Sequence, residues 1–529
     1  MSKRIAALVA LLAVLALSLV ATPPAPAAAS SPPTWSTPVA IYPQLPSSWF
    51  PDLFADPTGH FQLVYSGNLA EGDGNLTHAL TGTVMYTQLG ANGWPQPGDI
   101  EVMDAGIASR PLIASDGRYA YMIFRTGVFG TVRLCFARAP LSADLRNAHA
   151  WSDPTPLSDD GAYYGQIQVL ADGTLVVIYN QITGSTLAAT PAARGATPVA
   201  ATPNFRVEVM SRRSTDGGAT WSVPAHVSAS SERAARTALA VGPDKHTLIA
   251  VWDEGYDNLT GQGDPVGGGT AVSTDGGATW QSQQEIRSSR GPFEQTAVAF
   301  GASGALLVYR SINQPQLLYR QSADNGRHWG EEQVVPQAVA RPYGDKHNFE
   351  KISLASDGDG RLLLAYVGQD PQAPNGLGVF VATFAGDTWS TPAEIAAPVG
   401  YPEYPRVAIA LGNQLQVVYF VRDSEYTVGH YTLWSVAGQS DAHAIAPANP
   451  PPVAAPAPVI QPTLPPVRIQ PYPTVVAPAP LTAAQQRRLV SPQAEVNGPA
   501  FAAFTALLPV LGLILLATAA VHFLSGRRI

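Results

Sequence analysis

This chain is poor in cysteine, in charged residues and in basic excess, and each scarcity excludes a class of protein. Its 529 residues include one cysteine, Cys135, which excludes an intramolecular disulfide and a thiolate metal cluster. Charged residues make up 13% of the sequence, roughly half the share in an average soluble domain, which argues against a long helical or coiled-coil protein. Lys and Arg total 31 against 39 Asp and Glu, so the chain lacks the positive excess expected of a nucleic-acid-binding protein.

Glycine and proline are abundant by comparison. The chain holds 47 glycines and 48 prolines, together well above the average share of about 12%. Many turn-forming residues combined with little charge favour an all-β body with unstructured flanks. The length allows more than one domain.

The sequences at both ends of the chain are typical of targeting segments. Lys3 and Arg4 precede an apolar run from Ile5 to Val20 and small residues up to Ala29, which predicts a secretory signal peptide over residues 1–29. At the other end, residues 499–524 form an apolar stretch long enough for a membrane-spanning helix, and Arg527 and Arg528 follow it. We therefore expect a single-pass cell-membrane protein with an extracellular N-terminal domain and a cytoplasmic tail at 525–529.

A proline-rich segment precedes the apolar stretch. Thirteen of the 34 residues from Pro447 to Pro480 are proline, and such a sequence builds no core but extends. We expect residues 441–498 to form a stalk that separates the membrane from a folded body at 33–440.

The body repeats one motif, Ser-x-Asp-x-Gly-x-x-Trp, three times. Its members are Ser214, Asp216, Gly218 and Trp221; Ser273, Asp275, Gly277 and Trp280; and Ser322, Asp324, Gly326 and Trp329. Ser and Asp side chains can bond turn backbone, Gly supplies a positive φ, and Trp packs against a sheet. We expect a structural clasp between two outer strands. The motif resembles the Asp-box, or BNR repeat, of sialidases and other Asp-box β-propellers.

The spacing of the repeats predicts the number of blades. Further tryptophans at 35, 94, 151 and 389 continue the series, and seven apolar segments that read as inner strands alternate with these landmarks. No tryptophan turn follows the last inner strand, so we expect the strand near Trp35 to close the ring by completing the last blade. The fold predicted is all-β, a seven-bladed Asp-box propeller. Sialidases of this family have six blades, and six is the alternative.

A column of cations marks the candidate binding site. Aligning the inner strands on Arg110 places Arg236, Lys351 and Arg406 at equivalent positions near the axis. Arginine suits carboxylate, sulfate and phosphate groups, and the resemblance to sialidases implies that arginines hold a substrate carboxylate. The competing interpretation is that these arginines pair with Glu294, Glu350 and Glu403 as salt bridges of the channel.

Catalytic residues are less defined. The resemblance implies a tyrosine nucleophile assisted by a carboxylate, and an acid/base aspartate. Tyr404 is the candidate nucleophile, Glu294 and Glu350 are the candidate carboxylates, and Asp52, with Asp345 as an alternative, is the candidate acid. Packing is the competing role for Tyr404.

Two functions remain open at this point. The first is a membrane-anchored, extracellular exo-glycosidase of sialidase type that acts on acidic glycans. The second is a non-catalytic surface propeller that binds glycans or protein. We expect a monomer with no cofactor. The oxygen-rich loops Glu71–Thr77 and Glu254–Thr260 leave Ca²⁺ binding as a lesser possibility.

Overall fold

The computed structural model describes residues 32–445 apart from twelve gaps: 42–46, 69–82, 91–99, 104–107, 128–131, 185–204, 229–232, 257–262, 342–351, 371–372, 424–429 and 444. The chain divides into two units, Met1–Pro456 and Ala457–Ile529, and all described residues belong to the first. The predicted signal peptide, residues 446–498 of the predicted stalk, the predicted helix at 499–524 and the tail lie outside this description. Within the described ranges, no helix has the length and apolar character needed to span a bilayer.

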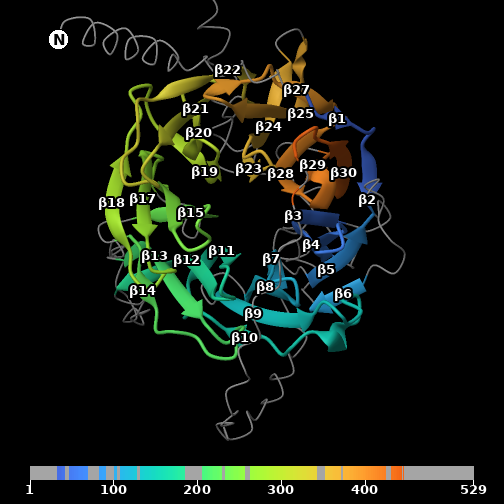
Figure 1. The fold of residues 1–529 in the computed structure, drawn as a ribbon, viewed down its shortest axis with the longest axis vertical. Helices are drawn as coiled ribbons and strands as arrows, with labels where there is room; N and C mark the ends of the chain where they lie inside the picture. Colours follow the sequence, from blue (N-terminus) through green and yellow to red (C-terminus); the bar gives the residue numbers. More distant parts are fainter. Residues whose placement is uncertain are drawn as a thin grey trace, which may run out of the picture. The chain divides into compact units, whose positions relative to one another are not determined.

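Seven antiparallel sheets form a ring, each with one strand next to the central axis (Figure 1). The inner strands are β3 (Ser47–Ala55), β7 (Ala108–Ser115), β11 (Ala162–Val169), β15 (Ala234–Val241), β19 (Phe293–Gly301), β23 (Ser353–Ser356) and β28 (Tyr401–Ile409). The second strands are β4 (Phe61–Asn68), β8 (Tyr119–Thr126), β12 (Leu175–Gly184), β16 (Leu248–Glu254), β20 (Gly304–Ser311), β24 (Leu362–Asp370) and β29 (Gln414–Arg422). The predicted inner strands are confirmed, and the ring has seven blades.

Third and outer strands complete each blade. The third strands are β5 (Thr83–Leu89), β9 (Arg133–Pro140), β13 (Phe205–Ser214), β17 (Gly267–Ser273), β21 (Gln316–Ser322), β25 (Ala373–Ala385) and β30 (Tyr431–Gln439). The outer strands are β6 (Ile100–Met103), β10 (Thr155–Pro156), β14 (Ala225–His226), β18 (Gln281–Ile286), β22 (Gln333–Val339), β26 (Thr388–Trp389) with β27 (Ala393–Ala396), and β1 (Thr34–Trp35) with β2 (Val39–Ile41). Two single-turn 3₁₀ helices, η1 (Ala148–Ala150) and η2 (Leu411–Asn413), lie in connections. We number the blades 1 to 7 from the one that contains β3.

The N-terminal strand closes the ring. Thr34 pairs with Gln439 and Trp35 with Gly438, so β1 is the outer strand of blade 7, whose inner strand β28 comes about 370 residues later. This is the predicted closure. It joins the two ends of the propeller by backbone hydrogen bonds and leaves no free blade edge there.

The hydrophobic core consists of seven clusters, one between each pair of neighbouring blades. Leu, Val, Ile and aromatic side chains from one blade pack against those of the next, and most are fully buried. The landmark tryptophans contribute to these clusters: Trp221 packs between blades 2 and 3, Trp280 between 3 and 4, and Trp329 between 4 and 5. Each blade therefore buries its faces only against its neighbours, which explains why the sequence repeats.

The three Asp boxes have one hydrogen-bond pattern. In the first, the Ser214 hydroxyl donates to Asp216 at 2.7 Å and accepts from the Gly218 amide at 2.8 Å, while Asp216 accepts from the Thr220 amide at 2.9 Å. The second and third boxes repeat these bonds. The turn joins the third strand to the outer strand, and it also reaches the preceding blade. Trp280, for example, donates to the Ser211 hydroxyl of blade 3.

Candidate functional site at the start face

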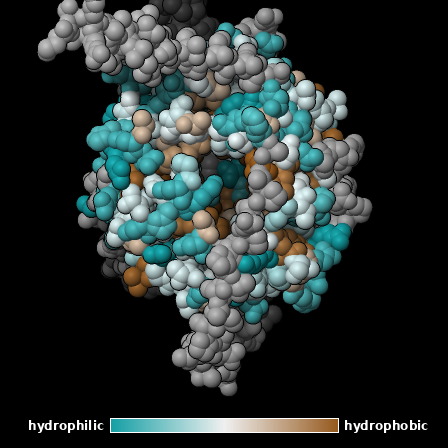
Figure 2. Space-filling model, viewed as in Figure 1, coloured by the Kyte–Doolittle hydropathy of each residue, from teal (hydrophilic) through white to brown (hydrophobic). Residues whose placement is uncertain are grey.

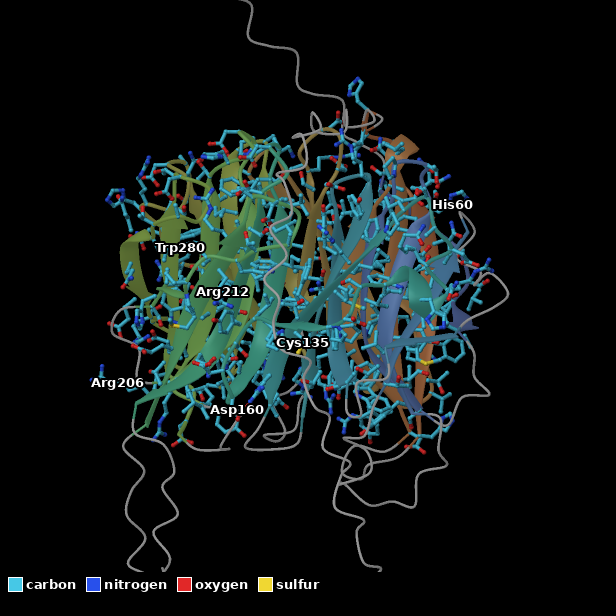
Figure 3. All side chains as sticks on the ribbon, turned by 90° about the horizontal axis from the view of Figure 1, so that it is seen from below. His60, Cys135, Asp160, Arg206, Arg212 and Trp280 are labelled. Carbon is cyan, nitrogen blue, oxygen red and sulfur yellow. The ribbon has the colours of Figure 1, made fainter. Side chains whose placement is uncertain are left out.

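The two faces of the propeller differ in which strand ends they present. Asp160, just before β11, and Arg206, in β13, lie toward one face, and His60, in the turn between β3 and β4, lies toward the other (Figure 3). We call the first the start face, because the inner strands begin there, and the second the end face. Second strands end and third strands begin at the start face, so side chains from three strands of each blade converge on it.

Six of the seven inner strands carry a β-bulge near the start face. The register with the second strand shifts at Trp49/Asp52, Ser109/Leu112, Ala162/Gly165, Ala234/Thr237, Glu294/Ala297 and Glu403/Arg406. In each, two inner-strand residues face one residue of the second strand. Bulges re-aim side chains and are common next to binding sites. We call this ring of residues the bulge layer.

The bulge layer stores backbone strain. The first bulge residue has a positive φ in four strands: Phe50 (+52°), Arg110 (+51°), Gln295 (+62°) and Tyr404 (+54°). Non-glycine residues rarely adopt this conformation, and each such residue costs on the order of 1–3 kcal/mol. Buried acceptors hold the strained amides: Ser66 of blade 1 accepts from the Arg110 amide at 2.8 Å, and Asp253 of blade 4 accepts from the Gln295 amide at 2.8 Å. Neighbouring blades thus fix the bulges in place.

The bulges correct the alignment of the cationic column. Arg110 is the first residue of its bulge, Arg236 is the second, and Arg406 follows its bulge. The register equivalent of Arg110 in blade 7 is Tyr404. A bulge turns the following side chains to the other face of the strand, so residues one or two positions out of register with it point to different places, and the sequence does not mark where each bulge lies. Lys351 and Glu350 lie outside the described residues.

Arg406 lies deeper than the bulge layer. Its Nε donates to Asp52 at 2.8 Å, and the other Asp52 oxygen accepts from the Ile113 amide at 2.9 Å. This pair lines a cavity of about 600 Å³ with Gln166 and Lys245, and the surface is hollowed at the centre of the ring (Figure 2). Arg110 and Arg236 do not line that cavity. The expectation of one pocket shared by all three arginines is therefore wrong, and the predicted acid Asp52 is engaged in an ion pair.

The structure separates the proposed catalytic pair. Tyr404 is 8% exposed, belongs to the core between blades 7 and 1, and packs edge-on against Phe50 with ring centroids 5.4 Å apart. Glu294 lies in blade 5 and accepts from Arg236 at 3.1 Å. Blade 6 stands between them. Arg236 with Glu294 matches the salt-bridge interpretation, as does Arg406 with Asp52.

Arg110 belongs to a cluster of cations and aromatic rings. Its guanidinium carbon lies 3.7 Å from the centroid of the Phe50 ring, 5.4 Å from that of Tyr163 and 5.0 Å from that of Tyr164. Arg125, at the end of β8, lies 3.9 Å from the Tyr163 centroid. Arg110 and both tyrosines are half-buried, whereas Arg125 is 7% exposed. The cluster lies at the starts of β7 and β11, on the side of the start face.

Mutual electrostatics perturb the cluster. Burial opposes ionisation of Tyr163, but the charges of Arg125 and Arg110 outweigh it and bring the pKa of that phenol down to about 8. Burial and the charge of Arg110 lower the pKa of Arg125. Burial would also lower the pKa of Arg236, but Glu294 reverses the shift and raises it. Two guanidinium groups therefore lie against the Tyr163 ring, and among the described residues Arg125 donates to the Ser109 hydroxyl rather than to a carboxylate.

Several buried polar atoms of this layer lack a hydrogen-bond partner among the described residues. They are Arg125 Nη1, both amide atoms of Gln295, and the hydroxyls of Thr237, Thr296 and Ser311. Buried polar groups are nearly always satisfied in native proteins, so each such group calls for an explanation. All five residues lie in or beside the bulge layer. A polar ligand at the axis would supply the missing partners.

Comparison with known protein families identifies the family of this chain. Residues 141–417, more than half of the chain, match the BNR repeat-like domain family. The chain belongs to this family. A comparison with curated proteins gives no match.

Solved structures similar to this BNR repeat-like protein come from several enzymes. The intramolecular trans-sialidase from Ruminococcus gnavus is 13% identical, with a TM-score of 0.41, over 76% of this chain and 96% of that one. A PL25 ulvan lyase is 12% identical, with a TM-score of 0.45, over 75% and 94%. A GH93 α-L-arabinofuranosidase of Fusarium graminearum is 12% identical, with a TM-score of 0.42, over 66% and 97%. Identities this low say nothing about activity.

Sequence reasoning about this BNR repeat-like chain missed Arg125, Tyr163 and Tyr164. A signal for Arg125 existed in the second strands: Ile123-Phe-Arg-Thr126 and Val308-Tyr-Arg-Ser311 both end in arginine followed by a hydroxyl residue. Arg125 and Arg310 face the residue just before the bulge, Ser109 in one case and Glu294 in the other. The paired tyrosines had no such echo in another blade.

The described residues contain no group of three or more His, Cys, Asp or Glu side chains that could hold a metal ion. Residues 69–82 and 257–262, which contain most of the two oxygen-rich loops, are outside the description. Glu254, at the start of the second loop, accepts from Trp252 Nε1 at 3.0 Å and pairs with Arg287.

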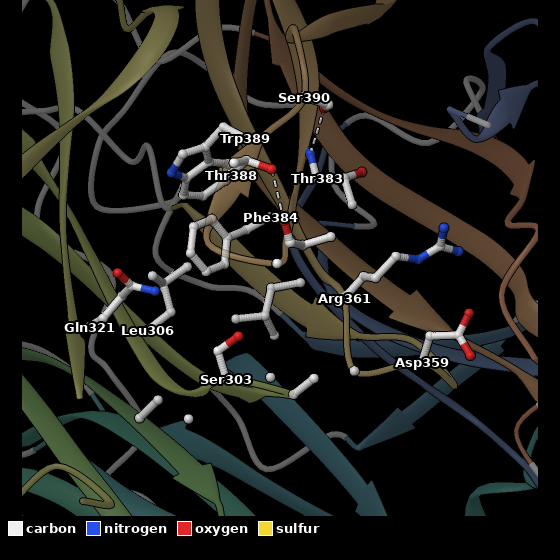
Figure 4. A pocket seen from close by; sticks show the side chains of 18 residues that line it. Ser303, Leu306, Gln321, Asp359, Arg361, Thr383, Phe384, Thr388, Trp389 and Ser390 are labelled. Carbon is white, nitrogen blue, oxygen red and sulfur yellow. Dashed lines mark hydrogen bonds between the residues drawn. The ribbon is translucent and has the colours of Figure 1, made fainter. Parts of the chain in front are cut away.

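A groove of about 690 Å³ separates blades 5 and 6 near the end face (Figure 4). Register places Phe384 where the Asp boxes have serine, because Phe384 pairs with Leu362 as Ser214 pairs with Leu175. Trp389 follows Phe384 by five positions, whereas each box tryptophan follows its serine by seven. The box glycine of blade 5, Gly326, covers Ile249 of blade 4. The shorter turn of blade 6 leaves the equivalent Leu306 on the wall of the groove.

Proposed function

We propose that this protein is a membrane-anchored, extracellular propeller that binds acidic glycans at its start face. Arg110 and Arg125 hold the anionic group, and Tyr163, Tyr164 and Phe50 provide aromatic surface for the sugar ring. The observation that most directly supports this proposal concerns Arg125, which is buried beside the Arg110 guanidinium. Among the described residues, its Nη1 has no hydrogen-bond partner and no carboxylate is bonded to it. Buried charge without compensation is costly, so an anionic partner is expected.

The last described residues contact the end face. Asp441 accepts from Arg361 Nη1 at 2.7 Å, and the His443 amide donates to Asp359 at 3.2 Å. Arg361 immediately precedes β24 and Asp359 lies in the turn before it, so both contacts are at the end face. These residues therefore lie on the face opposite to Arg110 and Arg125, and they do not cover the proposed binding site.

Glycoside cleavage is the second candidate function. Tyr163 has the lowered pKa and the neighbouring cations that an activated phenol nucleophile needs. In such a reaction the Tyr163 oxygen attacks the anomeric carbon, the glycosidic C–O bond breaks, and the phenol proton passes to the departing oxygen; water then hydrolyses the glycosyl-tyrosine and restores the phenol. Release of a fluorogenic aglycone from a sialoside that stops in Tyr163→Phe would establish catalysis, and binding without release would establish a lectin-like role.

The experiment for binding uses the full-length protein in detergent micelles and isothermal titration calorimetry. 3′-Sialyllactose and digalacturonic acid should bind more tightly than lactose and the dimethyl ester of digalacturonic acid. Arg125→Gln should weaken binding of the acidic probes about tenfold or more, the worth of one hydrogen bond between charged groups. Arg133→Gln is the control, because Arg133 pairs with Asp160 and is about half exposed.

The stability of the variant separates binding from folding. Because Arg125→Gln removes an uncompensated buried charge, unfolding of the ligand-free protein should change by no more than about 1 kcal/mol. Neutral probes that bind as tightly as acidic ones would overturn the proposal. So would an Arg125→Gln protein that is folded and binds the acidic probes unchanged.

A further inference from the structure

The axial cavity that Arg406 and Asp52 line is separate from the start-face cluster. Its volume is about 600 Å³, and its wall consists of the end-face halves of β3, β7 and β11, the turns after these strands, residues of blades 4 and 7, and Ile445. The described residues that line it do not include Arg110, Arg125 or the tyrosines beside them. Figure 2 shows the hollow at the centre of the ring. The volume is typical of ligand sites, which span roughly 300–1,000 Å³.

The charged side chains of this cavity do not favour an anion. The lining contains two cations, Arg406 and Lys245, and three carboxylates, Asp52, Asp56 and Asp116. Arg406 binds Asp52, whereas Asp56 and Asp116 accept from backbone amides of their own turns at 2.8 to 3.1 Å. Because the carboxylates outnumber the cations, a further negative charge would be repelled. Each carboxylate is already bonded, so the lining favours a neutral ligand.

Gln166 is a buried polar side chain of the lining without a partner among the described residues. It is 9% exposed, and its side-chain amide makes no hydrogen bond within the described ranges, whereas Gln168 donates to the Leu239 carbonyl at 3.3 Å. Arg406 adds a donor: Nε and Nη2 both bind Asp52, and Nη1 makes no such bond to a described residue. Buried polar groups nearly always have partners. A group that both donates and accepts, such as a hydroxyl, suits this amide.

Apolar side chains form part of the rim. Ile409, Leu411 and Ile445 line the cavity, and all three are half-buried. The residues before Ile445 are held against the end face, since Asn413 donates to the Ala442 carbonyl. An apolar wall with a few polar groups is the usual composition of a small-molecule site. A sugar ring, which carries both C–H faces and hydroxyl groups, matches this combination.

We propose that the axial cavity is a second binding site of the propeller and that it takes a neutral sugar ring. The Gln166 amide and Arg406 Nη1 bind hydroxyl groups of the ring, and the apolar rim packs against its C–H groups. This goes beyond the proposed acidic-glycan site at the start face, with which the cavity shares no residue. The two sites therefore fill independently.

Saturation-transfer difference NMR on the full-length protein detects such a ligand, in micelles of a detergent without a sugar headgroup. The probes are the methyl glycosides of glucose, galactose and mannose. At least one should give a saturable signal, and its dissociation constant should be unchanged by saturating digalacturonic acid. With digalacturonic acid present, the uronate counterpart of that glycoside should bind at least about fivefold more weakly, because it brings a negative charge to the three carboxylates.

Variants locate the neutral probe. Gln166→Met keeps the length of the side chain but removes the amide, and it should raise the dissociation constant about fivefold, the worth of one neutral hydrogen bond. Gln314→Met is the matched control and should change nothing, because Gln314 is exposed in the turn between β20 and β21. Ala114 also lines the cavity, and Ala114→Leu should weaken binding by narrowing it. Thermal unfolding shows which variants fold, and Ala114→Leu decides the matter if Gln166→Met does not.

The outcomes separate this inference from the proposed function. If no neutral glycoside gives a saturable signal, the cavity holds water alone and the inference is wrong. A signal that disappears with digalacturonic acid places the neutral sugar at the start face and also overturns it, as does an unchanged dissociation constant in the folded variants of Gln166 and Ala114. If acidic glycans fail to bind while the neutral glycoside binds and responds to Gln166→Met, the proposed function falls and the second site stands.

Discussion

At the scale of single residues, the Asp-box glycines combine two constraints that the motif alone does not separate. Gly218 has a φ of +87°, and a Cβ there would overlap the Phe136 ring of the preceding blade. Gly59, in the turn between β3 and β4, has the same φ of +87° with nothing within 4 Å of an added Cβ. The box glycine is therefore required both by the turn and by the close approach to the preceding blade.

Gly218→Ala should destabilise the propeller more than Gly59→Ala does. Both variants place a Cβ at positive φ, which costs about 1–2 kcal/mol. Only Gly218→Ala also overpacks the core between blades 2 and 3, which adds about 1–3 kcal/mol. Urea unfolding followed by tryptophan fluorescence measures the difference. Equal losses would show that the Phe136 contact relaxes at no cost and that the glycine serves the turn alone.

Tyr163 should make ligand binding dependent on pH. Its phenol is brought to a pKa of about 8 by Arg125 and Arg110 against the effect of burial, so above that pH the phenolate competes for the same arginines. Affinity for digalacturonic acid should fall as pH rises through about 8. Tyr163→Phe should abolish the fall. An identical pH profile in the two proteins would mean that this phenol does not ionise beside the arginines.

The same group links pH to stability. A phenol whose pKa is lower in the folded than in the unfolded chain binds its proton more weakly when folded. Its stabilising contribution is therefore fully present above the unfolded value of about 10 and is lost as pH falls through about 8. As pH rises through this window, the free energy of unfolding of the wild type should increase relative to that of Tyr163→Phe. A difference independent of pH would contradict the linkage.

At the scale of elements, the outer strand of blade 7 is supplied by the other end of the chain. Trp35 packs between blades 6 and 7 as Trp389 packs between blades 5 and 6, and both tryptophans lie in the same pentapeptide, Thr-Trp-Ser-Thr-Pro. Gly438 makes room for the Trp35 ring. The two outer strands are thus equivalent in packing, although one is sequence-local and the other is not.

Trp35→Ala and Trp389→Ala should cost similar amounts of stability. Each removes a partly buried indole from a core between blades, a loss of about 2–4 kcal/mol. Denaturant unfolding of the two variants side by side measures both values. If Trp35→Ala changes nothing while Trp389→Ala destabilises, the N-terminal strand does not hold the ring closed in solution.

At the scale of the whole molecule, the start face and the end face of the propeller carry different kinds of structure. The start face holds Arg110 and Arg125 beside strained bulges, while the end face holds short turns and the last described residues, 440–443 and 445. Arg361 donates to Asp441 and Ser440, and these bonds hold the segment against blade 6.

Deleting everything after Val496 should convert a membrane-associated protein into a released one. The apolar stretch at 499–524 is the proposed anchor, and the truncation leaves the described propeller whole. Fractionation of expressing cells should find the full-length protein with membranes and the truncated protein in the external medium or periplasm. A truncated protein that stays with membranes after removal of its leader places the anchor elsewhere.

The sequence by itself determined the repeat and hence the fold. The three Asp boxes, the tryptophan spacing and the alternation of apolar segments are local patterns, and each reports one blade. Even the closure by Trp35 followed from a count, because a ring of seven inner strands needs a seventh outer strand. Arg236 and Glu294 were expected near the axis because inner-strand starts converge in any propeller, and the two residues form an ion pair between neighbouring inner strands.

Only the tertiary structure decided which side chains meet. No sequence mark shows where the bulge of each inner strand lies, so Arg110, Arg236 and Arg406, aligned as equivalents, occupy three different positions relative to their bulges, and Tyr404 packs into the core. Arg125 and Arg310 came from second strands, where an arginine in an otherwise apolar segment is indistinguishable from a solvated end. Convergence at an axis joins residues hundreds of positions apart. It depends on register and blade angle, which no local pattern records.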